Sequence, residues 1–180
     1  MDNSLIYSVG NRTAISTRNR TAIAESDLDP DDRALAAITD FMHEYQVTVR
    51  PDLPIHDALI AMICAGVHAL VVTQEVSESS EQLVLGLITS QATQAVMRKR
   101  HQQTDMLVRD VMTPWSELPL IHYESLRSLT ANDLYERFQG TGLTHFLIVE
   151  SDAHDLTIAR GLVSRAAVAR RLRNTREMTV

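Results

Sequence analysis

The sequence lacks several features that mark common classes of protein. It has one cysteine, Cys64, among 180 residues, so no disulfide can form within the chain. The formal net charge of −6 disfavours a general binder of nucleic acid or anionic membrane, which is usually basic. The apolar runs fall well short of the ~20 residues that a membrane-spanning helix needs, and no signal-peptide pattern is present. We therefore expect a reduced, cytoplasmic protein with no membrane or nucleic-acid partner.

The patterns of catalytic and metal sites are missing as well. The seven histidines are scattered without the spacing of metal ligands, and no cysteine or nearby Ser-His-Asp order accompanies them. Cys64 lies in an apolar helical run, which predicts a buried, unreactive thiol. The acidic stretch from Glu75 to Gln82 is typical of a solvated hairpin connection and not of a calcium loop. We therefore expect no enzyme and no metal site.

The N-terminal part of the chain differs from the rest. Residues 1–28 are polar and lack a sustained period, and they fit an extended arm that pairs with a sheet edge as well as a flexible tail. A helix is predicted to follow, with Asp29 as its cap and Pro30 in its first turn. Its short apolar stripe consists of Leu35, Ile38 and Met42.

A regular order of elements follows and then repeats. Short β-branched apolar runs predict strands, and the i, i+3, i+4 spacing of apolar residues predicts amphipathic helices. The first copy gives strand, helix, strand, strand and helix at residues 47–49, 55–63, 69–73, 83–89 and 90–101. The same order recurs at residues 120–122, 130–139, 146–149, 158–163 and 164–173. Asp52 is the expected cap of the first long helix, and Thr130 forms a capping box with Asp133 in the second copy.

Glycines punctuate both copies at matching places. Gly66 and Gly142 each stop the first helix of a copy. Gly86 follows Gly66 after 20 residues and Gly161 follows Gly142 after 19, so an internal repeat is the preferred interpretation.

These patterns predict an α/β (α+β) protein built from two β-α-β-β-α repeats. We expect a polar N-terminal arm at residues 1–28 and a first repeat with its leading helix at residues 29–104. The second repeat is expected at residues 105–173, followed by a C-terminal tail at residues 174–180.

Both repeats end their last strand in a similar way, with GLITSQA at residues 86–92 and GLVSRAA at residues 161–167. A hydroxyl just before a helix start suits a phosphorylated ligand, because the free N–H groups of a helix start attract anions. Thr89 and Ser164 are also good helix caps. Two interpretations stay open here: capping alone, and capping together with ligand contact.

At this point the residues resemble a tandem cystathionine-β-synthase (CBS) domain pair over residues 38–173. The resemblance rests on Val47–Leu59 (VTVRPDLPIHDAL), Gly66–Val72 (GVHALVV), Leu85–Thr89 (LGLIT) and Val108–Pro114 (VRDVMTP). The last of these looks like the usual start of a second CBS repeat, and Asp40-Phe-Met42 resembles a diverged form of that start for the first. Residues 123–129 fit less well and leave room for an extra turn.

The resemblance implies two units packed sheet to sheet as a pseudo-twofold pair, with ligand clefts between them. Such pairs commonly bind AMP, ADP, ATP or S-adenosylmethionine, form homodimers through their helices and act as sensors. In the ligand-binding members, an aspartate three residues after the hydroxyl helps to hold the ribose; here Ala92 and Ala167 stand in its place. The expected ligand-binding residues are Val49, Arg50, His68, Thr89, Gln91, His145, Ser164 and Arg165, with His68 and His145 in similar places before their strands.

The primary interpretation is a stand-alone, homodimeric regulatory module that senses an adenosyl ligand. The rival is a protein-interaction scaffold with degenerate clefts, which binds an unknown protein partner and no nucleotide. The basic runs Arg98–Arg100 and Arg170–Arg171 are interpreted as cations near helix C-termini, where they complement the helix dipole.

Overall fold

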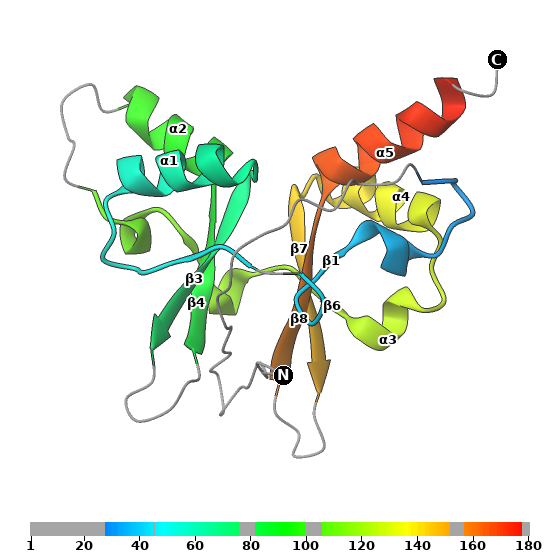
Figure 1. The fold of residues 1–180 in the computed structure, drawn as a ribbon, viewed down its shortest axis with the longest axis horizontal. Coiled ribbons are helices and arrows are strands. Elements are labelled where there is room, and N and C mark those ends of the chain that lie inside the picture. The colour runs from blue at the N-terminus through cyan, green and yellow to red at the C-terminus, as the bar shows by residue number, and fades with distance from the viewer. Residues whose placement is uncertain (1–27, 45, 76–81, 100–105, 152–156, 178–180) are drawn as a thin grey trace. The chain divides into compact units, whose positions relative to one another are not determined.

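The computed structural model describes residues 28–44, 46–75, 82–99, 106–151 and 157–177 (Figure 1). Within these ranges the chain divides into two compact units. The first holds residues 46–118 and 157–158, and the second holds residues 28–44, 119–151 and 159–177. The arm predicted at residues 1–28 lies outside the described residues, apart from Leu28.

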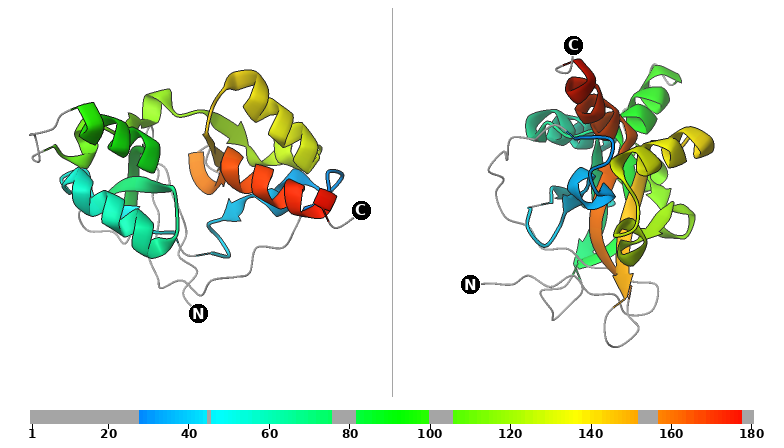
Figure 2. Two further views of the ribbon diagram at one scale, coloured as in Figure 1. Left: turned by 90° about the horizontal axis from the view of Figure 1, so that it is seen from above. Right: turned by 90° about the vertical axis from the view of Figure 1, so that its right-hand side faces the viewer.

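The first unit contains a four-stranded sheet in the order β2-β3-β4-β5. Its elements are β2 (Thr48–Val49), α1 (Ile55–Ala65), β3 (Ala69–Glu75), β4 (Gln82–Thr89), α2 (Ser90–Lys99), the 3₁₀ turns η2 (Val108–Asp110) and η3 (Trp115–Glu117), and β5 (Thr113–Pro114). β2 runs parallel to β3, whereas the β3–β4 and β4–β5 pairs are antiparallel. α1 and α2 lie side by side (Figures 1 and 2). Apolar side chains from the sheet and α1 form one core, which includes Val49, Ile55, Met62, Leu70 and Ile88.

The second unit repeats this plan with a sheet in the order β1-β8-β7-β6. Its elements are η1 (Ala34–Ala37), β1 (Thr39–Asp40), β6 (Leu120–His122), α3 (Tyr123–Leu126), α4 (Ala131–Thr141), β7 (His145–Ser151), β8 (Thr157–Ser164) and α5 (Arg165–Glu177). Phe138 and Phe146 lie at its centre with their ring centroids 4.6 Å apart. The predicted fold class and the duplicated order of elements are thus confirmed.

Local signals explain where the helices begin and end. Gly66 and Gly142 both adopt left-handed backbone angles, with φ of 64° and 70°, and end α1 and α4 as predicted. Thr130 accepts a hydrogen bond from the Asp133 N–H, while the Asp133 carboxylate accepts one from the Thr130 N–H. The predicted capping box is therefore present, and α3 occupies the extra turn expected after β6.

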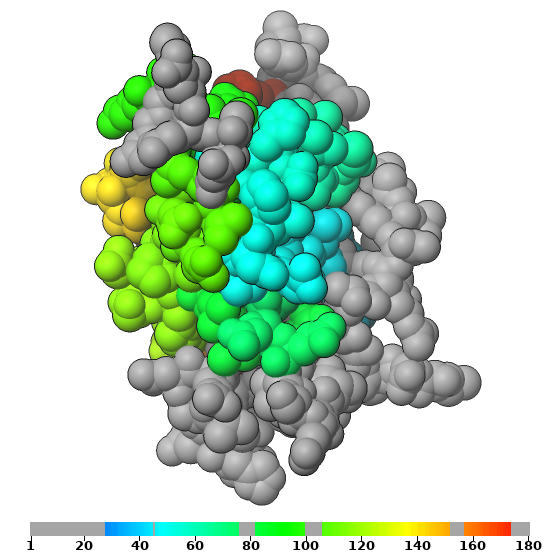
Figure 3. All heavy atoms as spheres, turned by 90° about the vertical axis from the view of Figure 1, so that its left-hand side faces the viewer, coloured from blue at the N-terminus to red at the C-terminus, as the bar shows by residue number. Residues whose placement is uncertain are grey.

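Each sheet gains an edge strand from a short segment that lies elsewhere in the sequence. The segment that joins the first sheet comes directly before the second repeat, and the segment that joins the second sheet comes directly before the first repeat. In the first unit, the Val108 N–H binds the Leu53 carbonyl and the Ile55 N–H binds the Met106 carbonyl. Figure 3 shows the light-green atoms of this segment beside the cyan atoms of the chain near the start of the first unit. In the second unit, the Ala34 N–H binds the Leu129 carbonyl in the same manner. We call residues 28–44 and 106–118 the two leading segments.

Each leading segment therefore joins the sheet of one repeat although it is adjacent in sequence to the other repeat. Residues 28–44 complete the second sheet, and residues 106–118 complete the first. The boundaries predicted from the sequence, 29–104 and 105–173, instead follow the order of the repeats along the chain.

The predicted leading helix is wrong. Only Ala34–Ala37 forms a short 3₁₀ turn, and Ile38 is already extended before β1. The backbone groups that a helix would use internally bond elsewhere, because the carbonyls of Pro30 and Asp32 accept from Asn132 and Ala131. Pairing with the second unit thus overrides the local helix signals of Asp29 and Pro30.

The proposed match between Asp40-Phe-Met42 and Asp110-Val-Met112 is also wrong. Asp40 lies opposite Gly161, as Pro114 lies opposite Gly86, so Asp40 is the counterpart of Pro114. In this register Ala36-Ala-Ile38 corresponds to Asp110-Val-Met112. The predicted and the observed alignments of the two segments differ by four residues. Ala36 stands where the other segment has Asp110, so no aspartate marks the correct alignment in the sequence.

Three smaller expectations differ from the structure. Asp52 does not cap α1; it pairs with Arg50 at 3.2 Å, and the residue before the helix is Pro54. Cys64 is exposed, because it lies on the side of α1 that faces away from the core. Residues 174–177, predicted as tail, continue α5 to Glu177.

Candidate functional site

The end of β4 and the start of α2 form the first candidate site. The Thr89 hydroxyl accepts a hydrogen bond from the Ala92 N–H at 3.2 Å, and the Ser90 N–H binds the His68 carbonyl at 2.9 Å. The buried Thr93 hydroxyl donates to the Thr89 carbonyl at 2.9 Å. Thr89 therefore caps α2, and two of the first N–H groups of this helix are already bonded.

The end of β8 and the start of α5 repeat this arrangement. The Ser164 hydroxyl accepts from the Ala167 N–H at 3.1 Å, and the Arg165 N–H binds the Thr144 carbonyl at 2.9 Å. The capping role predicted for Thr89 and Ser164 is thus present in both units. Neither α2 nor α5 has an acidic residue in its first turn, so the positive ends of both helices lack a local counter-charge.

The structure groups some of the predicted site residues of the first unit and separates others. Thr89 pairs with Ala69, next to His68, and the exposed Gln91 lies in the first turn of α2. Val49 instead pairs with Val72, three residues further along β3, which corresponds to roughly 10 Å. Val49 is buried in the core.

Arg50 and the two histidines take different places than a simple repeat suggests. The exposed Arg50 side chain forms its ion pair with Asp52. His68 is exposed, and its counterpart in the second unit is Thr144, as the hydrogen bonds from Ser90 and Arg165 show. His145 is one residue further, where it begins β7 half-buried with its Nδ1 3.0 Å from the Thr144 hydroxyl. The two histidines are therefore not equivalent.

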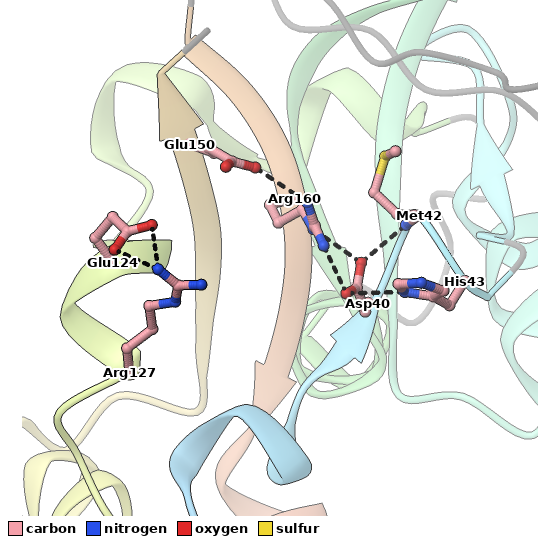
Figure 4. A network of polar contacts seen from close by, with 7 residues as sticks. All are labelled: Asp40, Met42, His43, Glu124, Arg127, Glu150 and Arg160. Atoms are coloured by element: carbon pink, nitrogen blue, oxygen red, sulfur yellow. Dashed lines mark hydrogen bonds and ion pairs between the residues drawn. The ribbon is translucent and has the colours of Figure 1, made fainter.

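A charged network in the second unit was not foreseen from the sequence. Arg160 of β8 binds both carboxylate oxygens of Asp40 at 3.0 Å and one oxygen of Glu150 at 3.1 Å (Figure 4). Its guanidinium also lies 4.5 Å from the ring centroid of Tyr123. Asp40 further accepts from the Met42 N–H and lies 3.1 Å from His43 Nδ1. The network joins the leading segment to the sheet, and only the register of β1 with β8 could have revealed it.

The network changes the acidity of its members. Burial raises the pKa of the Asp40 carboxyl, but the hydrogen bonds from Arg160 and Met42 and the charge of Arg160 outweigh it, so this pKa lies below its ordinary value. Burial lowers the pKa of Arg160, but its bonds to Asp40 and the neighbouring charges raise it above the ordinary value. Both groups are therefore charged at neutral pH.

The remaining chemistry of the described residues is limited. No cluster of histidine, cysteine, aspartate or glutamate in the described ranges has a geometry that could hold a metal ion. No helix among these residues is long and apolar enough to cross a membrane. What the two strand ends offer is backbone and hydroxyl hydrogen bonding beside the positive end of a helix, which suits binding.

The duplicated β-α-β-β-α units with hydroxyl-bearing strand ends define the tandem CBS-domain fold. No family model matches the sequence, and no curated protein is similar to it. Among solved structures, the chain is similar to the CBS-domain protein ATU1752 from Agrobacterium tumefaciens, with 18% identity, a TM-score of 0.56 and coverage of 84% of this chain and 98% of that one.

Two further structures share the fold and were solved with a nucleotide. One is CBSX2 in complex with AMP, with 17% identity, a TM-score of 0.52 and coverage of 81% and 98% of the two chains; CBSX2 is from Arabidopsis thaliana. The other is the CBS domain of a bacterial CNNM/CorC family Mg²⁺ transporter in complex with ATP, with 12% identity, a TM-score of 0.53 and coverage of 79% and 88%. The chain therefore has the fold of CBS-domain proteins.

Proposed function

We propose that this protein is a cytoplasmic CBS-pair regulatory module that senses an adenine nucleotide or related adenosyl ligand and catalyses no reaction. The observation that carries the proposal is the pair of equivalent strand ends, Thr89 before α2 and Ser164 before α5. AMP and ATP bind to two proteins of the same fold, which supports this class of ligand. ADP and S-adenosylmethionine belong to the same class.

The site differs from an ordinary adenosine site in one respect. Ala92 and Ala167 stand where the ligand-binding members carry an aspartate, and their N–H groups are bonded to the capping hydroxyls. A hydrogen bond to a charged group contributes roughly 1.5–3 kcal/mol, which corresponds to a roughly 10- to 150-fold difference in affinity. We therefore expect weak binding, with Arg165 and the start of α5 nearest to the phosphates.

Calorimetry with AMP, ADP, ATP and S-adenosylmethionine tests the proposal. We expect the wild type to release heat only at high ligand concentration. The Ala167→Asp variant restores the carboxylate and is expected to bind roughly 10- to 150-fold more tightly. Ala166→Asp is the matched control, because it places the same charge in the first turn of α5 on an exposed residue.

Two results would overturn the proposed sensor function. If neither the wild type nor Ala167→Asp shows heat or a thermal shift at millimolar ligand, adenosyl sensing is wrong. Equal gains in both variants would assign the effect to helix stabilisation and would also contradict the proposal.

We further propose that the protein is a homodimer that associates through α1 and α2. Ile60 and Ile63 on α1 are 45% and 70% exposed, and Met97 on the neighbouring helix α2 is also exposed. Their counterparts on α4 of the second unit are polar, since Glu136 and Gln139 stand in place of Ile60 and Ile63. An apolar surface on one helix pair supports association through that pair.

A second candidate function is a protein-interaction scaffold that binds no nucleotide. The same two alanines favour it, because a strand end whose hydroxyl only caps a helix has no need of a ribose carboxylate. In this case the Ala167→Asp variant gains no affinity, and the exposed surface of α1 contacts a protein partner.

A further inference from the structure

The C-terminal half of α1 presents an apolar face to the outside. Ile60 and Ile63 are 45% and 70% exposed, and Cys64, which follows them, is exposed as well. Residues three and four apart on a helix are neighbours, so these three side chains form one continuous surface. We call Ile60, Ile63 and Cys64 the α1 patch. A contiguous apolar surface of this kind favours contact with a partner.

The surroundings of the α1 patch carry no charge. Neither α1 nor the neighbouring helix α2 has an acidic or basic residue in residues 58–65 and 90–97 (Figure 2). The charged residues of this helix pair stand towards the helix ends, with Asp57 in the first turn of α1 and Arg98 and Lys99 in the last turn of α2. An uncharged centre with charged residues at its edge is typical of the buried part of a protein–protein contact.

The counterpart of the α1 patch in the second unit is charged. Because α1 and α4 both have 11 residues, Glu136 is the counterpart of Ile60. Gln139 is the counterpart of Ile63, and the exposed Asp133 lies one turn before Glu136 on the same face. Packing this face of α4 against the α1 patch would take both carboxylates out of water without an opposite charge. Packing it against the same face of a second copy would bring like charges together.

The two other large apolar side chains exposed in the described residues form no second patch. Met42 follows β1 and Leu120 lies on β6, at opposite edges of the second sheet. In a head-to-tail contact, one surface of a copy meets a different surface of the next copy. In a twofold contact the same surface of both copies meets, so one self-complementary patch is sufficient. The α1 patch therefore fits a twofold contact.

We propose that two copies associate about a twofold axis beside Ile60 and Ile63, with α1 packed against α1 of the second copy and with no part taken by α4. The inference rests on the proposed homodimer and adds its symmetry, the helix at its centre and its limit of two copies. Antiparallel α1 helices place Ile60 of each copy against Ile63 of the other. Asp57 then lies at the edge of the contact, opposite the uncharged Gly66 of the second copy.

Cys64 reports on this arrangement because it is the one cysteine in the chain. It follows Ile63 directly and therefore lies near the proposed axis. Packed helices are about 8–10 Å apart and rise about 1.5 Å per residue, so the two thiols of an antiparallel pair lie roughly 10–15 Å apart. A flexible bis-maleimide can therefore join the two copies.

Cross-linking of the full chain with a bis-maleimide, together with sedimentation velocity, tests the proposal. The wild type is expected to give a covalent dimer and no larger species. Ile63→Lys keeps the thiol but is expected to lose the covalent dimer, because it places a charge in the α1 patch.

The matched control moves the thiol to the counterpart helix. The double variant Cys64→Ser/Gln139→Cys changes two exposed residues, so the fold is expected to persist, which circular dichroism checks. This variant is expected to sediment as a dimer and to lose the covalent dimer. A third variant, Gln139→Cys with Cys64 retained, tests for a contact between α1 and α4.

The other outcomes each contradict a different part of the proposal. A cross-link in the double variant would show that α4 also meets its own copy, so α1 would not be the centre of the contact. Species larger than a dimer, or a covalent dimer formed only by the third variant, would show a head-to-tail contact. A dimer in sedimentation that does not cross-link through Cys64 would overturn the twofold arrangement and leave the homodimer standing. A monomeric wild type would contradict both.

Discussion

At the scale of single residues, the pair formed by Arg160 and Asp40 shows how one contact determines the position of a segment. The side chains of Arg160 and Asp40 are only 17% and 19% exposed, and the guanidinium contacts both carboxylate oxygens. Such two-pronged pairs are directional as well as strong. The corresponding residues in the first unit, Leu85 and Pro114, are apolar, so this position of the leading segment is held by charge in the second unit and not in the first.

We expect Asp40→Asn to lower the free energy of unfolding by about 2 kcal/mol at neutral pH, because it removes the charge from a partly buried hydrogen-bonded pair. The folded pKa of Asp40 lies below its unfolded value, so its contribution is complete above the unfolded pKa of about 3.9. The contribution is lost as the pH falls through the lowered pKa, and the difference between wild type and variant should then close. Urea denaturation at a series of pH values measures this.

The exposed pair of Arg127 and Glu124 provides the control. Glu124→Gln should change the free energy of unfolding by less than about 0.5 kcal/mol at any pH. A difference for Asp40→Asn that does not depend on acid pH would contradict the electrostatic explanation.

At the scale of elements, the sequence revealed most of the helices and strands. The predicted starts of β4, α4 and β8 lie within one residue of the observed ones, because apolar periodicity, capping residues and glycines act locally. The prediction of a helix in the leading segment of residues 28–44 failed for the opposite reason. Its Asp29 and Pro30 signal a helix, but bonds to residues 129–132, about a hundred residues away, determine its path.

The candidate site was predicted only in part. The capping hydroxyls Thr89 and Ser164 act within three residues of themselves and could be found from sequence. The mismatch of His68 and His145 could be read from the sequence, because His68 follows Gly66 by two residues whereas His145 follows Gly142 by three. The hydrogen bonds from Ser90 and Arg165 agree with this count.

Pairing of the leading segments requires glycine at two places. A Cβ atom at Gly86 would overlap the Thr113 carbonyl oxygen, and one at Gly161 would lie 2.7 Å from the Thr39 carbonyl oxygen. Both obstacles are backbone atoms that cannot rotate away. We expect Gly161→Ala to lower the free energy of unfolding by about 1–3 kcal/mol, as measured by urea denaturation.

Gly140 is the matched control for this substitution. It lies within α4, and an added Cβ atom there meets nothing within 4 Å. Gly140→Ala should therefore raise the free energy of unfolding, by up to about 1 kcal/mol, since alanine is the better helix former. Equal effects at Gly140 and Gly161 would contradict the close-approach argument.

At the scale of the whole molecule, the two helix pairs differ in the surface they present. We expect Ile63→Lys to convert the proposed homodimer to a monomer, because it places a charge in the apolar surface of α1. Gln139→Lys changes the counterpart residue on α4 and should leave the dimer intact. Sedimentation velocity at micromolar concentration measures both, and a monomeric wild type would contradict the homodimer.

The crossing of the leading segments has a mechanical consequence. The first sheet is formed by one contiguous stretch of sequence, from β2 to β5. Along the chain this stretch lies between β1 and β6, which both belong to the second sheet. Both Leu28 and the end of α5 belong to the second unit. A pulling force applied at these two points loads the bonds of Leu28 and Ala34 to Arg171 and Leu129 first, and then the β1–β8 pairing with the Asp40–Arg160 pair. We therefore expect the second unit to open before the first unit bears load.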